Sequence, residues 1–217
     1  MATTTPSTSR RAATAARRLS AARIRDLLLV ALTFSSGAID AISFLALGKV
    51  FTAFMTGNVV FLGLRVAGAG GPDVVRVLIA VGAFAAGVFV ATRIVAPTRG
   101  SGVWPRRVSV ALGLVVVAQA AFLALWMATS GRPGSGSADG LTALMALAMG
   151  LQSGAVMALA VQGVFTTAAT ATVMFLMRDV AAGPGSARAE RVRLAAVLGA
   201  LFGGATAGGL LLVHAHA

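Results

Sequence analysis

Residues 27–47 read LLLVALTFSSGAIDAISFLAL, and this stretch decides the class of fold. A helix of 21 residues is about 31 Å long at 1.5 Å per residue, which matches the hydrocarbon core of a bilayer. The stretch is too long for the apolar core of a signal peptide. Asp40 is its only charged residue. These residues therefore predict a membrane-spanning helix with one acid inside it.

The composition of the whole chain indicates the same class. Of the 217 residues, 58% are hydrophobic and 11% are charged, with a mean hydropathy of +0.90. An average soluble protein has about 25% charged residues, so this chain lacks the polar side chains to cover a water-facing surface. A disordered protein and an ordinary soluble domain are both excluded. The absence of cysteine also excludes disulfides, thiol nucleophiles and cysteine metal sites.

Further apolar runs follow at residues 50–69, 75–96, 108–128, 141–161, 164–177 and 194–213. They predict an all-α fold, a polytopic transmembrane helical bundle of six to seven helical segments within one domain, residues 26–214. Residues 1–25 are rich in Ser, Thr, Ala and Arg and show no apolar periodicity. We expect them to form a disordered basic tail in the cytoplasm.

The charged residues flank the apolar runs. Eighteen basic and six acidic residues give a net charge of +12. No nucleic-acid-binding motif accompanies this charge, and basic residues between apolar runs are typical of membrane topology. We therefore expect the lipid bilayer, and not nucleic acid, as the partner. The abundance of Arg, Ala and Gly is typical of a high-GC bacterium, so we predict a multi-pass protein of the bacterial plasma membrane with a cytoplasmic N-terminus.

Two segments of the chain resemble each other. Residues 45–62 (LALGKVFTAFMTGNVVFL) and 159–176 (LAVQGVFTTAATATVMFL) are identical at nine of eighteen positions with an offset of 114. Gly82-Ala83 and Gly87 correspond to Gly199-Ala200 and Gly204 in the runs that follow. The chain is therefore predicted to contain two repeats, residues 27–96 and 141–213, joined by a central helix at 108–128.

The relative orientation of the repeats depends on the runs at 50–69 and 164–177. If both cross the membrane, seven spans result and the repeats are parallel; if both are re-entrant, five spans result and the repeats are inverted. The seven-span arrangement places 13 basic residues inside and 5 outside, and the five-span arrangement places 14 inside and 4 outside. Both alternatives therefore stay open.

Asp40 is the most informative polar residue. A charge in the middle of a bilayer costs roughly several kcal/mol, so a charged side chain there usually faces a cavity or a partner. Ser36 and Ser43 lie one turn away on the same helix face. Thr56-Gly57-Asn58 favours local unwinding, which is tolerated at membrane depth only where backbone lines a cavity or is buried in protein. The corresponding region of the second repeat contains Gln152 and Thr170.

The motif Gly37-Ala38-Ile39-Asp40-Ala41-Ile42-Ser43-Phe44-Leu45, followed by Met55-Thr56-Gly57-Asn58, resembles the YoaK-like family of bacterial multi-pass membrane proteins, a domain of unknown function. Gly150-Leu151-Gln152 and Thr166-Thr167 are similar to the family's second-half motif. That motif commonly reads Gln-Asn and Thr-Gly-Thr, whereas Ser153 and Ala171 stand here at the Asn and Gly places. The resemblance implies location and architecture, and it implies no substrate.

We predict a permease for a small solute, with a polar site near the membrane midplane. Its site residues are Asp40, Ser43, Thr56, Gly57, Asn58, Gln152 and Thr170. A change in the charge of Asp40 can couple such transport to protons. The alternative is a structural, sensory or assembly protein whose polar residues only hold helices together. We expect no enzyme activity, catalytic residue, cofactor or metal site, because the other acids lie at span ends and both histidines lie in the last four residues.

Overall fold

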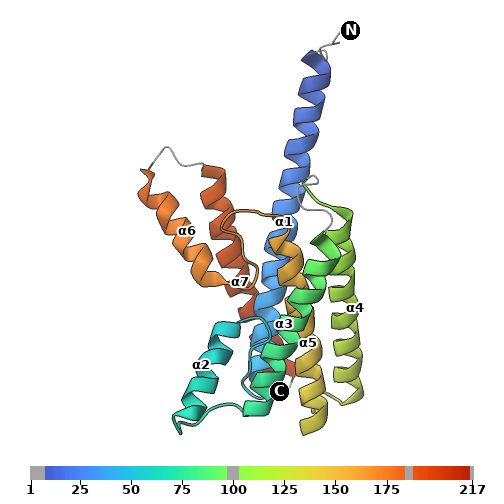
Figure 1. The fold of residues 1–217 in the computed structure, drawn as a ribbon, viewed down its shortest axis with the longest axis vertical. Coiled ribbons are helices and arrows are strands. Elements are labelled where there is room, and N and C mark those ends of the chain that lie inside the picture. Colours follow the sequence, from blue (N-terminus) through green and yellow to red (C-terminus); the bar gives the residue numbers. More distant parts are fainter. Residues whose placement is uncertain (1–7, 97–102, 184–187, 216–217) are drawn as a thin grey trace.

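The computed structural model describes residues 8–96, 103–183 and 188–215, and every regular element in these ranges is a helix (Figure 1). The predicted all-α, polytopic helical fold is confirmed. Five of the helices are long and apolar enough to cross a membrane. The helices are α1 (Thr8–Ala46), α2 (Met55–Val66), α3 (Val74–Val95), α4 (Arg106–Ala128), α5 (Ser135–Met157), α6 (Ala169–Ala181) and α7 (Arg188–Ala215).

The structure differs from the predicted tail at the start of the chain. Helix α1 begins at Thr8, so the chain is helical over most of the range for which we expected disorder; residues 1–7 lie outside the described residues. The sequence between Thr8 and the first apolar run consists largely of Ala and Arg. These residues have high helix propensity and extend a helix that the membrane already stabilises.

The structure distinguishes the two open topologies, because α2 and α6 are too short to span. They contain 12 and 13 residues, or about 18–20 Å of helix, against about 30 Å of bilayer core. Non-helical segments precede them, at residues 47–54 and 158–168. We call these segments the first and second broken segments. Their positions support the five-span, re-entrant arrangement.

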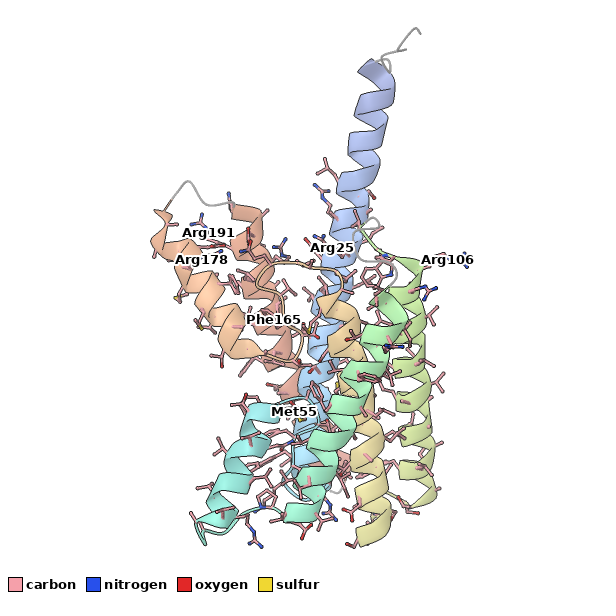
Figure 2. The ribbon with its side chains drawn as sticks, viewed as in Figure 1. Arg25, Met55, Arg106, Phe165, Arg178 and Arg191 are labelled. Carbon is pink, nitrogen blue, oxygen red and sulfur yellow. The ribbon has the colours of Figure 1, made fainter. Side chains whose placement is uncertain are left out.

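The two re-entrant regions enter from opposite ends of the bundle. Helix α1 runs downward in Figure 1, the first broken segment climbs back beside it, and α2 descends again. Helix α5 runs upward, the second broken segment turns back down, and α6 rises. In Figure 2, Met55 and Phe165 both lie between the two ends of the bundle. Met55 is at the start of α2, and Phe165 is in the second broken segment. Both tips therefore lie at intermediate depth.

Two pairs of long helices form the scaffold, and glycines permit their close approach. In the α1–α7 pair, Gly204 lies against the carbonyl oxygen of Phe34, and Gly37 lies against that of Leu201. A Cβ atom at either glycine would overlap that oxygen. Gly208 of α7 makes a third such contact, which assigns part of the glycine-rich face of this helix to packing.

The α3–α5 pair repeats this arrangement. Gly87 lies against the carbonyl oxygen of Leu147, and Gly150 lies against that of Phe84. The broken segments also enter the apolar core: Ala53 packs in a cluster with α3, α4 and α5, and Val164 in a cluster with α1 and α7. The positions of the two tips are therefore fixed by packing against the scaffold.

Candidate functional site

Asp40 holds the first broken segment. Its Oδ1 accepts hydrogen bonds from the backbone nitrogens of Thr52 at 2.9 Å and Ala53 at 2.8 Å, and from the Thr52 hydroxyl at 3.4 Å. Thr52 and Ala53 are buried and non-helical, so their N–H groups have no helical carbonyl partner. Asp40 supplies the acceptor that backbone at this depth requires. The Phe54 backbone N–H also approaches this carboxylate.

Asn58 is the second anchor of this segment. Its side chain is fully buried; its Nδ2 donates to the Phe51 carbonyl at 2.6 Å, and its Oδ1 accepts from the Phe51 nitrogen at 3.0 Å. One amide thus satisfies both backbone groups of a residue outside any helix. The unwinding predicted near Thr56-Gly57-Asn58 lies just before these residues, and Asn58 stabilises it from the first turn of α2.

Aromatic rings surround the same segment. The Phe51 ring stacks on Phe44 with 5.1 Å between centroids, and Phe54 meets it edge-on at 5.3 Å. Gly57 allows this packing, because a Cβ atom there would lie 2.7 Å from the Phe54 ring. The sequence indicated a break here, but it gave no sign that three phenylalanines meet beside Asp40.

The second broken segment is held differently. The hydroxyl of Ser153 in α5 lies 3.0 Å from the hydroxyl of Thr167, where the first half has a carboxylate. Gln152 donates from Nε2 to the Leu32 carbonyl of α1 at 3.2 Å. Among the described residues, its Oε1 and the hydroxyl of the buried Thr166 have no partner. Buried polar atoms without partners are uncommon and mark a region able to bind further polar groups.

A cavity of about 490 Å³ lies between the tips of the two broken segments and helices α1 and α7. Its volume falls within the range of about 300–1,000 Å³ that is typical of small-molecule sites. Both halves of the chain contribute to its lining, which includes Ser36, Asp40, Phe44, Phe51, Phe54 and Thr167. The hydroxyl of Ser36 is fully buried and has no hydrogen-bond partner among the described residues. The cavity thus combines apolar walls with a few polar groups.

The structure places the seven predicted site residues in different environments. Asp40 alone lines this cavity. Asn58 and Gly57 support the backbone beside it, whereas Thr56 and Thr170 are exposed on α2 and α6. Ser43 donates to the backbone carbonyl of Asp40 and lines a second, smaller cavity of about 290 Å³ against α4. Gln152 is buried against α1.

Thr167 and the three phenylalanines are cavity residues that we did not predict. Thr167 lies in the Thr-rich stretch at 166–172. The alignment of the two halves with an offset of 114 pairs Thr56 with Thr170, and so it indicated Thr170 and not Thr167. Aromatic residues are common in membrane-spanning sequences, so their pattern alone did not mark a site.

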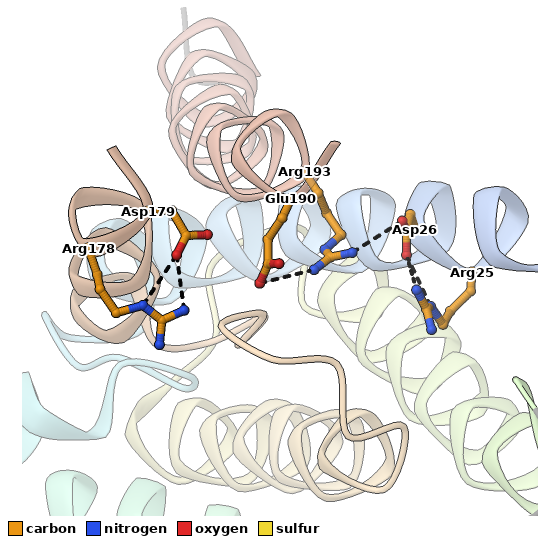
Figure 3. A network of polar contacts seen from close by, with 6 residues as sticks. All are labelled: Arg25, Asp26, Arg178, Asp179, Glu190 and Arg193. Atoms are coloured by element: carbon orange, nitrogen blue, oxygen red, sulfur yellow. Dashed lines mark hydrogen bonds and ion pairs between the residues drawn. The ribbon is translucent and has the colours of Figure 1, made fainter. Parts of the chain in front are cut away.

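Ion pairs connect the scaffold helices at both ends. At one end, Arg76 of α3 donates to Asp139 of α5 at 2.6 Å and to the Leu47 carbonyl at 3.3 Å. At the other end, Arg193 of α7 lies 3.7 Å from Asp26 of α1 (Figure 3). Figure 3 also shows the neighbouring pairs Arg25–Asp26, Glu190–Arg193 and Arg178–Asp179. Each end of the bundle therefore has its own ion pair between long helices.

Comparison with known proteins agrees with this architecture. Residues 28–217 match the family model described as "Protein of unknown function (DUF1275)". The chain belongs to this family. It is also 35% identical over 162 residues to the UPF0700 transmembrane protein YoaK of Bacillus subtilis (strain 168), across 75% of this chain and 70% of that protein. No solved structure matches. The DUF1275 match confirms the predicted YoaK-like family, and the protein is a multi-pass membrane protein.

Proposed function

We propose that the protein is a permease for a small solute, with its binding site in the cavity at Asp40. The observation that carries this proposal is the position of that cavity between two broken segments that enter from opposite ends of the bundle. Secondary transporters bind their substrates near the midplane, between discontinuous helices contributed by two repeats. The Asp40 carboxylate supplies the polar group that such a site needs.

An inverted repeat supports the proposal. Positions in α1 and α5 correspond with an offset of 113, and positions in α3 and α7 with an offset of 117. These offsets relate the contact of Gly204 with Phe34 to that of Gly87 with Leu147. They also relate the contact of Gly37 with Leu201 to that of Gly150 with Phe84.

The ion pairs at the two ends obey the same offsets. Arg76 corresponds to Arg193, and Asp139 corresponds to Asp26. Helices α2 and α6 begin at positions 55 and 169. The difference of 114 equals the offset that aligns the two similar segments of the sequence. Helices α1 and α5 run in opposite directions in Figure 1, which supports an inverted arrangement of the two proposed repeats.

The distribution of basic residues supports a bacterial plasma-membrane protein with its N-terminus in the cytoplasm. Figure 2 shows Arg25, Arg106, Arg178 and Arg191 at the end of the bundle from which α1 enters. The connections at the opposite end contain fewer basic residues: Lys49, Arg65, Arg76 and Arg132. Basic residues concentrate on the cytoplasmic side of a membrane.

A structural role is the second candidate, and one observation favours it. The three hydrogen bonds at Oδ1 make Asp40 a support for the backbone, whether or not a solute binds. The two roles use the same carboxylate. A cavity-blocking variant separates them, because it leaves Asp40 and its hydrogen bonds in place.

The test is flux through proteoliposomes that contain the purified protein. Ala169, in the first turn of α6, lines the cavity, and Ala169→Phe would fill part of it. Ala85→Phe, at an exposed position of α3, is the matched control. We expect stopped-flow swelling in a panel of small solutes to show a protein-dependent flux that Ala169→Phe removes and Ala85→Phe retains. No protein-dependent flux, or equal flux in both variants, would overturn the permease and leave the structural role.

A further inference from the structure

The cavity at Asp40 has a chemical character that narrows the class of ligand. Phe44, Phe51 and Phe54 line it together with Asp40. The Phe51 ring stacks on both Phe44 and Phe61, and Phe54 packs edge-on against it, so the rings form one continuous apolar wall. Such a wall contacts the apolar groups of a ligand.

Asp40 determines the sign of the charge that fits. It is the one ionisable side chain among the described residues that line the cavity. The backbone N–H groups of Thr52 and Ala53 bind Oδ1, the Phe54 N–H also approaches the carboxylate, and the carboxylate lines the cavity. The Ser36 hydroxyl, one helical turn from Asp40, is buried in the same lining without a partner. A ligand therefore meets a carboxylate oxygen, a hydroxyl and a wall of rings.

The start of α6 acts in the opposite direction. Ala169 lines the cavity, and the N-terminus of a helix carries partial positive charge, which favours anions. That partial charge is about half of an elementary charge, whereas a carboxylate carries a full one. The Thr167 hydroxyl before α6 is already paired with Ser153. The balance of these groups favours a positively charged ligand.

We propose that this cavity binds a small organic cation of the alkylammonium class, with its charge at the Asp40 carboxylate and its alkyl groups against Phe44, Phe51 and Phe54. The proposal rests on the proposed function, because it names the class of solute for the same site. A carboxylate beside an apolar wall suits such a ligand, because the carboxylate attracts the charge and the rings contact the alkyl groups. An inorganic cation would gain less from the apolar surface that dominates this cavity.

The probe is choline, compared with two ligands of similar shape. In 3,3-dimethylbutanol a carbon replaces the quaternary nitrogen, and 3,3-dimethylbutanoate carries a negative charge. Titration calorimetry on the purified protein would measure binding of each, with NaCl as a separate titrant. We expect choline to bind about tenfold more tightly than the neutral alcohol, and the anion to bind most weakly. Equal affinity for the three, tighter binding of the anion, or binding of Na⁺ without choline would overturn the proposal.

Two pairs of variants keep this test interpretable. Asp40→Asn retains an acceptor for the N–H groups but removes the charge, and Asp73→Asn removes a charge from the exposed cap of α3. Phe44→Leu removes one ring from the wall, and Phe89→Leu removes an exposed ring from α3. We expect Asp40→Asn to weaken choline about tenfold with little change for the alcohol, Phe44→Leu to weaken both ligands, and the control variants to weaken neither. Loss of choline preference in the control variants as well would contradict the assignment.

Binding and flux distinguish the two proposals. Choline binding that depends on Asp40, without any flux in proteoliposomes, would overturn the permease and retain the cation site. Flux of neutral or anionic solutes without choline binding would overturn the cation site and retain the permease.

Discussion

The carboxylate of Asp40 accepts a hydrogen bond from the backbone nitrogen of Ala53 at 2.8 Å, although thirteen residues separate them in the chain. The chain leaves α1 at Ala46, turns at Gly48 and Lys49, and returns along the same helix to reach Asp40. Both turn residues have positive φ angles, 93° for Gly48 and 62° for Lys49. The acid within the first span thus determines where the returning backbone stops.

Substitution of Asp40 should separate charge from hydrogen bonding. Asp40→Asn keeps an oxygen that accepts from Thr52 and Ala53, so we expect a small change in melting temperature. Asp40→Ala leaves these N–H groups without an acceptor, and each unsatisfied buried group costs about 1–3 kcal/mol. Thermal unfolding in detergent should therefore rank wild type and Asp40→Asn well above Asp40→Ala. Equal melting temperatures for the two variants would contradict the assigned hydrogen bonds.

Asn58 should be more important for stability than another amide in the bundle. Asn58→Leu keeps the branch at Cγ but removes both hydrogen bonds to Phe51 and places a larger side chain in a fully buried position, for which we expect a loss of about 2 kcal/mol or more in the free energy of unfolding. Gln119→Leu is the control, since Gln119 makes one 3.3 Å bond to the Ser35 hydroxyl. Chemical denaturation of both variants checks the ranking. A larger loss in Gln119→Leu would show that Asn58 is not an anchor.

Glycines of α7 should differ according to their contacts. Gly204→Ala would place a Cβ atom on the Phe34 carbonyl oxygen, and we expect a loss of about 1–3 kcal/mol from overpacking. Gly199→Ala, five residues earlier, meets open space and should be neutral or stabilise the helix by up to about 1 kcal/mol. Melting temperatures of the two variants provide the comparison. Similar losses would mean that the α1–α7 contact is looser than described.

The topology can be tested with single cysteines, because the chain contains none. With five spans, positions 70 and 130 lie on one side of the membrane, and positions 22 and 103 lie on the other. With seven spans, position 22 lies on the same side as 70 and 130. We expect an impermeant maleimide applied to whole cells to label Gly70→Cys and Ser130→Cys, and to label Ala22→Cys and Val103→Cys only after permeabilisation. Protection of positions 22, 70 and 130 together, with labelling of position 103, would restore the seven-span arrangement.

The sequence predicted the spanning helices well because length and hydropathy determine which segments fit a bilayer. It did not show whether α2 and α6 cross the membrane. The apolar run at 50–69 is long enough to span, and hydropathy does not reveal a break in the backbone. The break depends on Asn58 and Asp40 meeting residues 51–53, which is a tertiary contact. Asp40 stood out as the one acid within a span, whereas Thr170 followed an alignment that could not place α6 in space. Helix α1 begins before the apolar run because Ala and Arg favour a helix even where the sequence is polar.

The two broken segments are held with unequal strength. The first is bound to a carboxylate by two backbone N–H groups and one hydroxyl, and its Phe51 is also bound by an amide. The second depends on the Ser153–Thr167 hydroxyl pair, with the Thr166 hydroxyl unbound among the described residues. Hydrogen bonds to a charged group are roughly twice as strong as neutral ones. Residues 158–168 should therefore exchange their amide hydrogens sooner than residues 50–54, so that any opening of the bundle begins at the end where α5 finishes.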